Sequence, residues 1–198
     1  MRALPSDEFL IYADAGTAFV ASPESLFPLC RERNGLLMFQ VHGYKNVTYV
    51  KRDCFVLMDC DMPHYWQAEQ VNAAFLVLQR TPTALAFIAE WIAWADSHEL
   101  ITDAPNRFGE PNLPDFLAHR HDQSILSLLA EKHRIPRSPD PSQWGEPHRH
   151  QSDGKFVPYP TIFRHHRQRT LFLRERLRIW LGARRHALFG EKKKTSVS

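Results

Sequence analysis

The sequence predicts a layered α/β domain. Short apolar runs with strand character alternate along the chain with stretches of helical periodicity. Hydrophobic residues make up 43% and aromatic residues 12% of the 198 residues, a composition typical of a folded chain with a substantial core. We expect this domain to occupy residues 1–167, with a separate basic segment over residues 168–198.

Three apolar runs are predicted to be strands. Residues 9–12 form the first and lead into Asp14 and a flexible glycine, while residues 35–40 and 73–80 form the other two. A side chain that directly follows a buried strand stands at the edge of the sheet, where α/β proteins commonly bind ligands. Asp14 is therefore a candidate site residue.

Two helices are predicted in the first half of the chain. Residues 46–58 fit either a strand or a helix, and Thr48 as an N-cap favours the helix. A second helix begins at Thr81 and Pro82, in the order expected of an N-cap and a first helical residue. Its buried stripe is predicted to consist of Leu85, Ile88, Ile92 and Ala95.

The second half is predicted to begin with a long loop. Residues 101–118 contain three prolines, and the stretch HRHDQSILSLLAEKH (119–133) follows as an amphipathic helix. The core-facing residues of that helix are predicted to be Ile125, Leu128 and Leu129. A proline-rich connection over 135–160 and the short segment TIF then lead to a basic helix at 168–189.

Charge is distributed unevenly along the chain. Residues 1–163 contain 14 basic and 20 acidic residues, a net charge of −6, whereas residues 164–198 contain 11 basic and 2 acidic residues, a net charge of +9. A nucleic-acid-binding domain would concentrate basic charge on its folded part, so we expect no nucleic acid partner. The amphipathic segment 168–198 is predicted either to lie on an anionic membrane surface or to pack on the domain.

The cysteines and the hydropathy indicate a cellular compartment. Cys30, Cys54 and Cys60 form no CxxC pair, which favours free thiols over a disulfide framework or a zinc site. No apolar run approaches the roughly 18–20 residues of a membrane-spanning helix, and no signal peptide opens the chain. We expect a cytoplasmic protein, peripheral on the membrane if the basic segment docks there.

The start of the helix at 119–133 carries more polar side chains than capping requires. Asp122 alone can satisfy a helix N-terminus, yet His119, Arg120, His121 and Gln123 stand beside it. A carboxylate at such a position can also hold or activate a substrate hydroxyl, and the exposed N–H groups attract anions. Asp122 is thus either a structural cap or a catalytic residue.

Metal-binding candidates occur at three places. Asp14 is the first, because carboxylate oxygens suit Mg²⁺ or Mn²⁺. Asp59 and Asp61 form a D-x-D pattern, although aspartates are common in turns. His165 or His166 can ligate a transition metal, with the start of the basic segment as the alternative.

Three further residues are candidates for ligand binding. Lys51 can neutralise a phosphate, Asn72 can hydrogen-bond a hydroxylated ligand, and Trp144 in a loop can stack on a sugar. A solvated lysine and a turn asparagine are the alternatives for the first two. A nucleophile elbow, a P-loop and a dinucleotide-binding glycine motif are all missing from the sequence.

Six segments of the chain carry a family resemblance: IYADAG, VKRDCFVLMDCDMPHYWQAEQVNAAFLVLQRTP, ITDAPNRFGEPN, HRHDQSILSLLAEKH, DPSQWG and YPTIFRHHRQR. In this order they resemble a group of bacterial glycosyltransferases that are associated with capsular and other surface polysaccharides. The resemblance covers residues 8 to about 169 and implies a GT-A fold, a mixed sheet with flanking helices that binds a nucleotide sugar. The HRHDQSILSLL string is its most specific part.

The resemblance also implies roles for individual residues. Asp14 looks like the first acid of the metal-binding D-x-D motif, with Gly16 in place of the second acid. Asp122 looks like the carboxylate near the acceptor, with Gln123 beside it, and His166 or His165 looks like the late metal ligand. His119, Arg120 and His121 are expected to shape the wall of the sugar cleft. Such enzymes carry a nucleotide-binding region before the first motif, so an N-terminally incomplete GT-A domain is expected.

The sequence therefore predicts a glycosyltransferase that uses Mn²⁺ or Mg²⁺. It would transfer a sugar from a nucleotide-sugar donor to a hydroxyl of a glycan or lipid-linked acceptor. The alternative is a non-catalytic relative of such enzymes that acts as a carbohydrate-binding or assembly protein.

Overall fold

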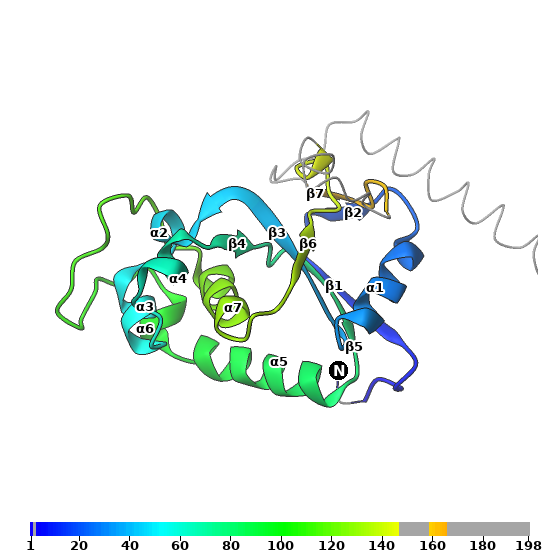
Figure 1. The fold of residues 1–198 in the computed structure, drawn as a ribbon, viewed down its shortest axis with the longest axis horizontal. Coiled ribbons are helices and arrows are strands. Elements are labelled where there is room, and N and C mark those ends of the chain that lie inside the picture. The colour runs from blue at the N-terminus through cyan, green and yellow to red at the C-terminus, as the bar shows by residue number, and fades with distance from the viewer. Residues whose placement is uncertain (2, 147–158, 166–198) are drawn as a thin grey trace, which may run out of the picture.

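The computed structural model describes residues 1, 3–146 and 159–165. These residues form a mixed α/β structure with seven strands, seven α-helices and one 3-10 helix (Figure 1). The strands are β1 (Phe9–Ala13), β2 (Thr17–Phe19), β3 (Leu36–Lys45), β4 (Glu69–Val71), β5 (Phe75–Gln79), β6 (Arg137–Pro139) and β7 (Phe163–His165). The helices are η1 (Pro23–Leu26), α1 (Phe27–Glu32), α2 (Asn46–Tyr49), α3 (Arg52–Leu57), α4 (Pro63–Gln67), α5 (Pro82–Ala95), α6 (His98–Ile101) and α7 (His121–Lys132).

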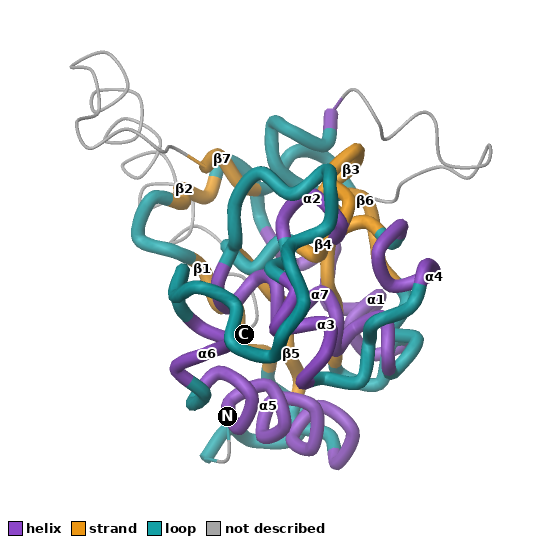
Figure 2. The backbone as a smooth tube through the Cα atoms, turned by 90° about the vertical axis from the view of Figure 1, so that its left-hand side faces the viewer, coloured by secondary structure: helices purple, strands orange, loops and turns teal. Residues whose placement is uncertain are grey.

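The main sheet is largely antiparallel. Its strand order is β1-β5-β3-β4, and β6 pairs with β3 in the parallel direction. Strands β2 and β7 form a separate antiparallel pair, at the opposite end of the described structure from α5 (Figure 2). Because β1 and β5 run in opposite directions, the end of β1 meets the beginning of β5.

Each face of the main sheet is covered by its own hydrophobic cluster. Alternate residues of a strand point to opposite faces, and β3 and β5 are apolar at both sets of positions. Helices α3, α5, α6 and α7 lie over one face and α1 over the other (Figure 1). The first cluster includes Leu36, Met38, Leu76 and Leu78, and the second includes Leu37, Phe39, Phe75 and Val77. Burial of each such side chain contributes about 1.5–3 kcal/mol.

The predicted strands are confirmed, with different ends. The strand predicted at 35–40 continues as β3 to Lys45, and the run at 73–80 forms β5. The segment at 46–58 is helical, as predicted, but it is divided into α2 and α3. Thr48 is not its N-cap: Lys45 and Lys51 precede the two helices, and neither side chain makes a capping hydrogen bond.

Helix α5 begins as predicted, and its buried stripe matches the predicted one in part. The Thr81 hydroxyl accepts a hydrogen bond from the Ala84 N–H, which confirms the cap. Ala84 and Phe87 are its buried residues, while Ile92 is 64% exposed. Ile88 and Ala95 pack partly buried against the core cluster as predicted, and Trp91 and Trp94 pack there with them.

Helix α7 packs on the sheet as predicted. Ile125, Leu128 and Leu129 are fully buried in the first cluster. Cys30, Cys54 and Cys60 are all buried free thiols, as the sequence predicts. The basic segment at 168–198 lies outside the described residues, and its membrane docking stays a prediction. Among the helices that the structure describes, none has the length and apolarity to cross a bilayer.

Gly35 and Gly43 provide a matched test of this packing. Both have a positive φ, +81° and +78°, but a Cβ on Gly35 would lie 2.7 Å from the Gln79 carbonyl oxygen, whereas a Cβ on Gly43 would meet nothing within 4 Å. We expect Gly43→Ala to lower the free energy of unfolding by about 1 kcal/mol through backbone strain, and Gly35→Ala by about 3 kcal/mol. Urea denaturation of both variants measures the difference, and equal losses would contradict it.

Candidate functional site

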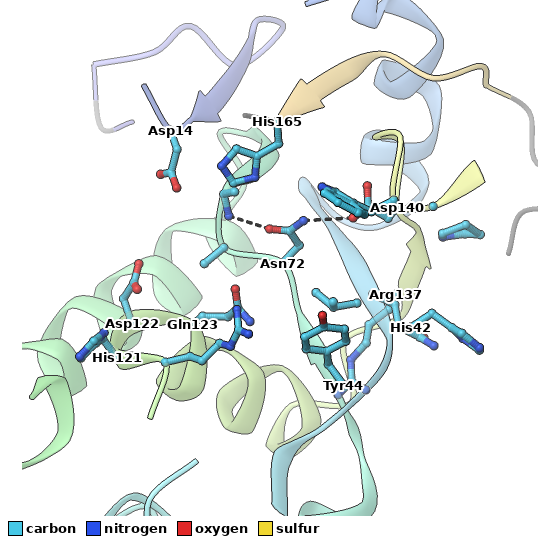
Figure 3. Close-up of a pocket in the computed structure, with 18 of the residues that line it drawn as sticks. Asp14, His42, Tyr44, Asn72, His121, Asp122, Gln123, Arg137, Asp140 and His165 are labelled. Carbon is cyan, nitrogen blue, oxygen red and sulfur yellow. Dashed lines mark hydrogen bonds between the residues drawn. The ribbon is translucent and has the colours of Figure 1, made fainter. Parts of the chain in front are cut away.

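A cavity of about 1040 Å³ opens where the two sheets and α7 meet (Figure 3). Five segments far apart in the sequence line it: the end of β1, the second half of β3, the β4–β5 connection, the start of α7 and the chain from β6 to β7. Nine residues singled out in the sequence line this cavity: Asp14, Asn72, His119, Arg120, His121, Asp122, Gln123, Trp144 and His165.

The pairing of β1 with β5 places Asp14 beside the β4–β5 connection. Ala13 is opposite Phe75, and the Asp14 N–H continues the ladder by donating to the Ala74 carbonyl at 2.8 Å. On the other side of this connection, the Asn72 N–H donates to the Phe39 carbonyl. Asp14 and Asn72 therefore come together through strand pairing rather than through sequence proximity.

Asp14 is held by a neighbouring tyrosine. The Tyr12 hydroxyl donates a hydrogen bond to Asp14 Oδ1 at 2.8 Å, since residues two apart on a strand share a face. This hydrogen bond is the main reason that the pKa of Tyr12 is raised, with burial and the charges of Asp14 and Asp122 as further causes. Tyr12, Asp14 and Asp122 thus form one electrostatically coupled group.

Asp122 lies in the first turn of α7 and faces the cavity. It does not serve as the N-cap: Arg120 occupies that position, and no side chain caps the helix. Desolvation by the cavity wall raises the pKa of the Asp122 carboxyl, and the charge of Asp14 raises it further. The Gln123 N–H and His121 act in the opposite direction. A carboxyl with a raised pKa in a cavity has a property typical of proton-transfer groups.

The histidines that flank Arg120 have different environments. His119 is 6% exposed; its Nδ1 accepts from the Lys51 N–H, and its Nε2 lies 2.7 Å from the Leu100 carbonyl oxygen. His121 lies at the cavity, where its Nε2 is 3.2 Å from Asp103 Oδ2. His119 therefore ties the start of α7 to the core, while His121 contributes to the cavity wall.

Gln123 is oriented by a buried partner. Its Nε2 donates to the Gln70 Oε1 at 2.6 Å, and Gln70 is fully buried on β4. Gln70 Nε2 has no partner in the described structure. The hydrogen bond holds the Gln123 side chain at the cavity in one orientation.

The turn after β6 forms one wall of the cavity. Asn72 Nδ2 donates to Asp140 Oδ2 at 3.1 Å, which links this turn to the β4–β5 connection (Figure 3). A Cβ on Gly145 would lie 1.9 Å from the Asp140 carbonyl oxygen, so only glycine fits there. Trp144, beside this glycine, is 64% exposed at the cavity. An exposed indole at a cavity can stack on a sugar ring.

Asp14 and His165, the two predicted metal ligands within the described residues that line the cavity, lie at the end that also holds Asp122 (Figure 3). No group of three His, Cys, Asp or Glu side chains within the described residues could hold a metal ion. Mg²⁺ commonly binds through one or two carboxylates, waters and substrate phosphates. This donor set therefore fits an ion that arrives with a diphosphate better than a closed structural site. His166 lies outside the described residues.

Two other candidates are away from the cavity. Lys51 is 3% exposed, and its Nζ donates to the Ala104 carbonyl, so its charge is used to hold the 101–118 loop rather than to line the cavity. Asp61 accepts hydrogen bonds from Arg52 and from the Trp66 indole, while Asp59 is an exposed turn residue. The D-x-D pattern at 59–61 is thus engaged in local structure.

The cavity also contains residues that the sequence did not indicate. Tyr12 does not itself line the cavity but holds Asp14 there, and it could have been found because it precedes Asp14 by two residues in a predicted strand. Tyr44, Arg137 and Asp140 had no recognisable signal, since the strand at 35–40 was predicted to stop before Tyr44 and residues 135–160 were predicted as a connection.

Comparisons of the chain with protein-family models, with curated proteins and with solved structures found no match in any of the three.

Burial of His119 predicts a pH-dependent stability. Desolvation lowers the pKa of His119 to about 4, whereas a histidine in the unfolded chain titrates near about 6.5. Between these values the unfolded chain binds a proton that the folded chain does not, so stability falls as the pH drops from about 6.5 to about 4, by about 3 kcal/mol in total.

We expect His119→Asn to reduce this pH dependence, whatever it costs at neutral pH. Urea denaturation at pH 7 and pH 4.5 gives the difference for each protein. His98→Asn, at an exposed position on α6, is the control and should keep the original difference. An unchanged difference in His119→Asn would show that other groups cause it.

Proposed function

We propose that this chain is a divalent-metal-dependent glycosyltransferase, or part of one. It would transfer a sugar from a nucleotide-sugar donor to a hydroxyl of a glycan or lipid-linked acceptor. The observation that carries the proposal is that Asp14 and Asp122, far apart in the sequence, face one cavity closely enough for the charge of Asp14 to raise the pKa of Asp122. Both residues belong to the motifs on which the glycosyltransferase resemblance depends.

Asp122 is assigned the acceptor side of the reaction. Its position in the first turn of α7 directs the carboxyl into the cavity, and its raised pKa makes the carboxylate a better proton acceptor than an ordinary aspartate. It would orient the attacking hydroxyl and take its proton as the new glycosidic bond forms. Gln123, held by Gln70, and His121 would position the sugars around it.

Asp14 is assigned the donor side. Together with His165, or with His166 beyond the described residues, it would hold the Mn²⁺ or Mg²⁺ ion, which neutralises charge on the departing nucleoside diphosphate. Tyr12 keeps the Asp14 carboxylate in place through its hydrogen bond. Trp144 offers an exposed ring against which a sugar can stack.

A non-catalytic saccharide-binding protein is the second candidate. It is favoured by the small number of metal-binding side chains at the described cavity, together with the exposed Trp144. A screen for hydrolysis of nucleotide sugars, with and without Mn²⁺, separates the two. A glycosyltransferase releases the nucleoside diphosphate slowly from its own donor in a Mn²⁺-dependent manner, whereas a binding protein releases none.

Asp122→Asn tests the proposed catalytic carboxylate. Asparagine keeps the size and hydrogen-bonding capacity of the side chain but cannot accept the proton, so we expect turnover to fall by about 10²–10⁴-fold, with a nearly unchanged melting temperature. Asp115→Asn, at an exposed loop position outside the cavity, is the matched control and should keep full activity. Full activity of Asp122→Asn would return Asp122 to a structural role.

Asp14→Asn tests the metal site. Asparagine retains one oxygen but no charge, so we expect Mn²⁺-dependent binding of the nucleoside diphosphate to be lost while the fold is kept. Calorimetric titration of UDP and GDP with Mn²⁺ provides the measurement. Asp59→Asn is the control, because it makes the same chemical change at an exposed turn away from the cavity. If Asp59→Asn is the damaging change instead, the metal has been assigned to the wrong acidic motif.

A further inference from the structure

One cation at the cavity has no acidic partner. Arg52, Arg107 and Arg137 each form an ion pair with a carboxylate in the described structure. Arg120 lines the cavity, is half-buried and pairs with no described carboxylate, and no described side chain or carbonyl accepts a hydrogen bond from its guanidinium. Partial burial of an unpaired charge is unfavourable, so a ligand that supplies the missing negative charge would be bound strongly here.

Two stacked tyrosines hold this guanidinium in place. The Arg120 Cζ lies 4.5 Å from the ring centre of Tyr49 and 5.3 Å from that of Tyr44, and the two rings stack at 5.0 Å. Cation–π contacts of this kind fix the plane of the guanidinium while leaving its N–H edge available to a second partner. A pre-oriented fork of N–H donors suits the two oxygens of a carboxylate or phosphate.

The backbone around Arg120 is also well anchored. Its N–H donates to the Tyr49 carbonyl and to the Ser124 hydroxyl, and the Ser124 hydroxyl donates to the same Tyr49 carbonyl. These hydrogen bonds join α2 to the start of α7 next to the Arg120 Cα. The arrangement is preformed, which lowers the entropic cost of binding.

Arg120 and Asp122 lie only two residues apart and line the same cavity. Tyr44 and His42 lie across the cavity from Asp14 and Asp122 in Figure 3. A diphosphate bound next to the carboxylates of Asp14 and Asp122 would need a metal ion to offset the charge repulsion. In the proposed function, Asp14 is the residue that helps to hold this ion. The unpaired charge of Arg120 is therefore available to the acceptor.

We propose that Arg120, Tyr44 and Tyr49 form a subsite for an oxyanion, a carboxylate or a phosphate, that is carried by the acceptor saccharide. This assignment rests on the proposed glycosyltransferase function. The acceptor is thus an acidic sugar whose anionic group binds Arg120 while a hydroxyl lies at Asp122.

Binding of simple sugars to the full chain tests the subsite without donor or turnover. The probes are methyl β-D-glucuronide, glucose 6-phosphate and the neutral methyl β-D-glucoside, measured by calorimetry or ligand-observed NMR. We expect at least one acidic sugar to bind about tenfold more tightly than the neutral sugar, and the preference to shrink as salt is added. The acidic sugar that is preferred identifies the group as a carboxylate or a phosphate.

Three variants show which residues cause the preference for acidic sugars. Arg120→Gln should abolish this preference. Tyr44→Ala should weaken it, and because Tyr44 is 38% exposed we expect this variant to fold. Arg107→Gln removes an exposed arginine outside the cavity and should leave it unchanged. Equal binding of acidic and neutral sugars, or an intact preference in Arg120→Gln, would overturn the proposal.

Two further outcomes separate this subsite from the proposed function. If Arg120→Gln weakens UDP–Mn²⁺ binding and leaves the acidic sugars unaffected, Arg120 belongs to the donor and the acceptor subsite is wrong. If the Arg120-dependent preference is found but no nucleotide sugar is hydrolysed, the subsite stands and the chain is a binding protein for acidic saccharides.

Discussion

Strand β5 pairs with β1 along one edge and with β3 along the other, and its alternate side chains enter two separate hydrophobic clusters. A strand that is buried on both faces has no tolerance for a shift in register, because a shift by one residue would exchange the two faces. The register of β1 against β5 then determines where β1 ends. Asp14 lies at the cavity because the ladder continues from its N–H to Ala74.

The second constraint is the packing of α7 against that sheet. Ser127 accepts a hydrogen bond from the Val71 N–H of β4, and the apolar residues from Ile125 to Leu129 are buried beneath it. The first turn of the helix is thereby brought to the edge of the sheet next to the β4–β5 connection. Asp122 and Asp14 line the same cavity as a result of these two packing arrangements.

The many polar side chains at the start of α7 make several different contacts. His119 anchors the backbone to the core, and Arg120 stacks on two tyrosines. His121 lies beside Asp103, Asp122 presents its carboxyl to the cavity, and Gln123 is fixed by Gln70. An ordinary helix start needs one capping side chain. Here none of the five side chains caps the helix, and all five residues line the cavity.

Local structure could be predicted from the sequence wherever one short pattern was sufficient. The apolar runs predicted β1, β3 and β5, the Thr81 cap predicted the start of α5, and the spacing of Ile125, Leu128 and Leu129 predicted the buried face of α7. Asp14 and Asp122 were recognised as unusual for the same reason, because each stands at the end of a well-defined element.

Packing between segments that are distant in the sequence determines which of these residues meet. Lys51 was predicted to bind a ligand but is buried under the 101–118 loop, and Ile92 of α5 was predicted to be buried but is exposed, while Trp91 and Trp94 pack against the core. Arg120 lies at the N-cap position before α7 and Tyr44 lies on β3. Neither segment carries a sequence pattern that predicts the contact between these two side chains. A pattern along the chain reports the burial of one element, whereas a cavity depends on long-range register and helix rotation, which are decided by packing between elements.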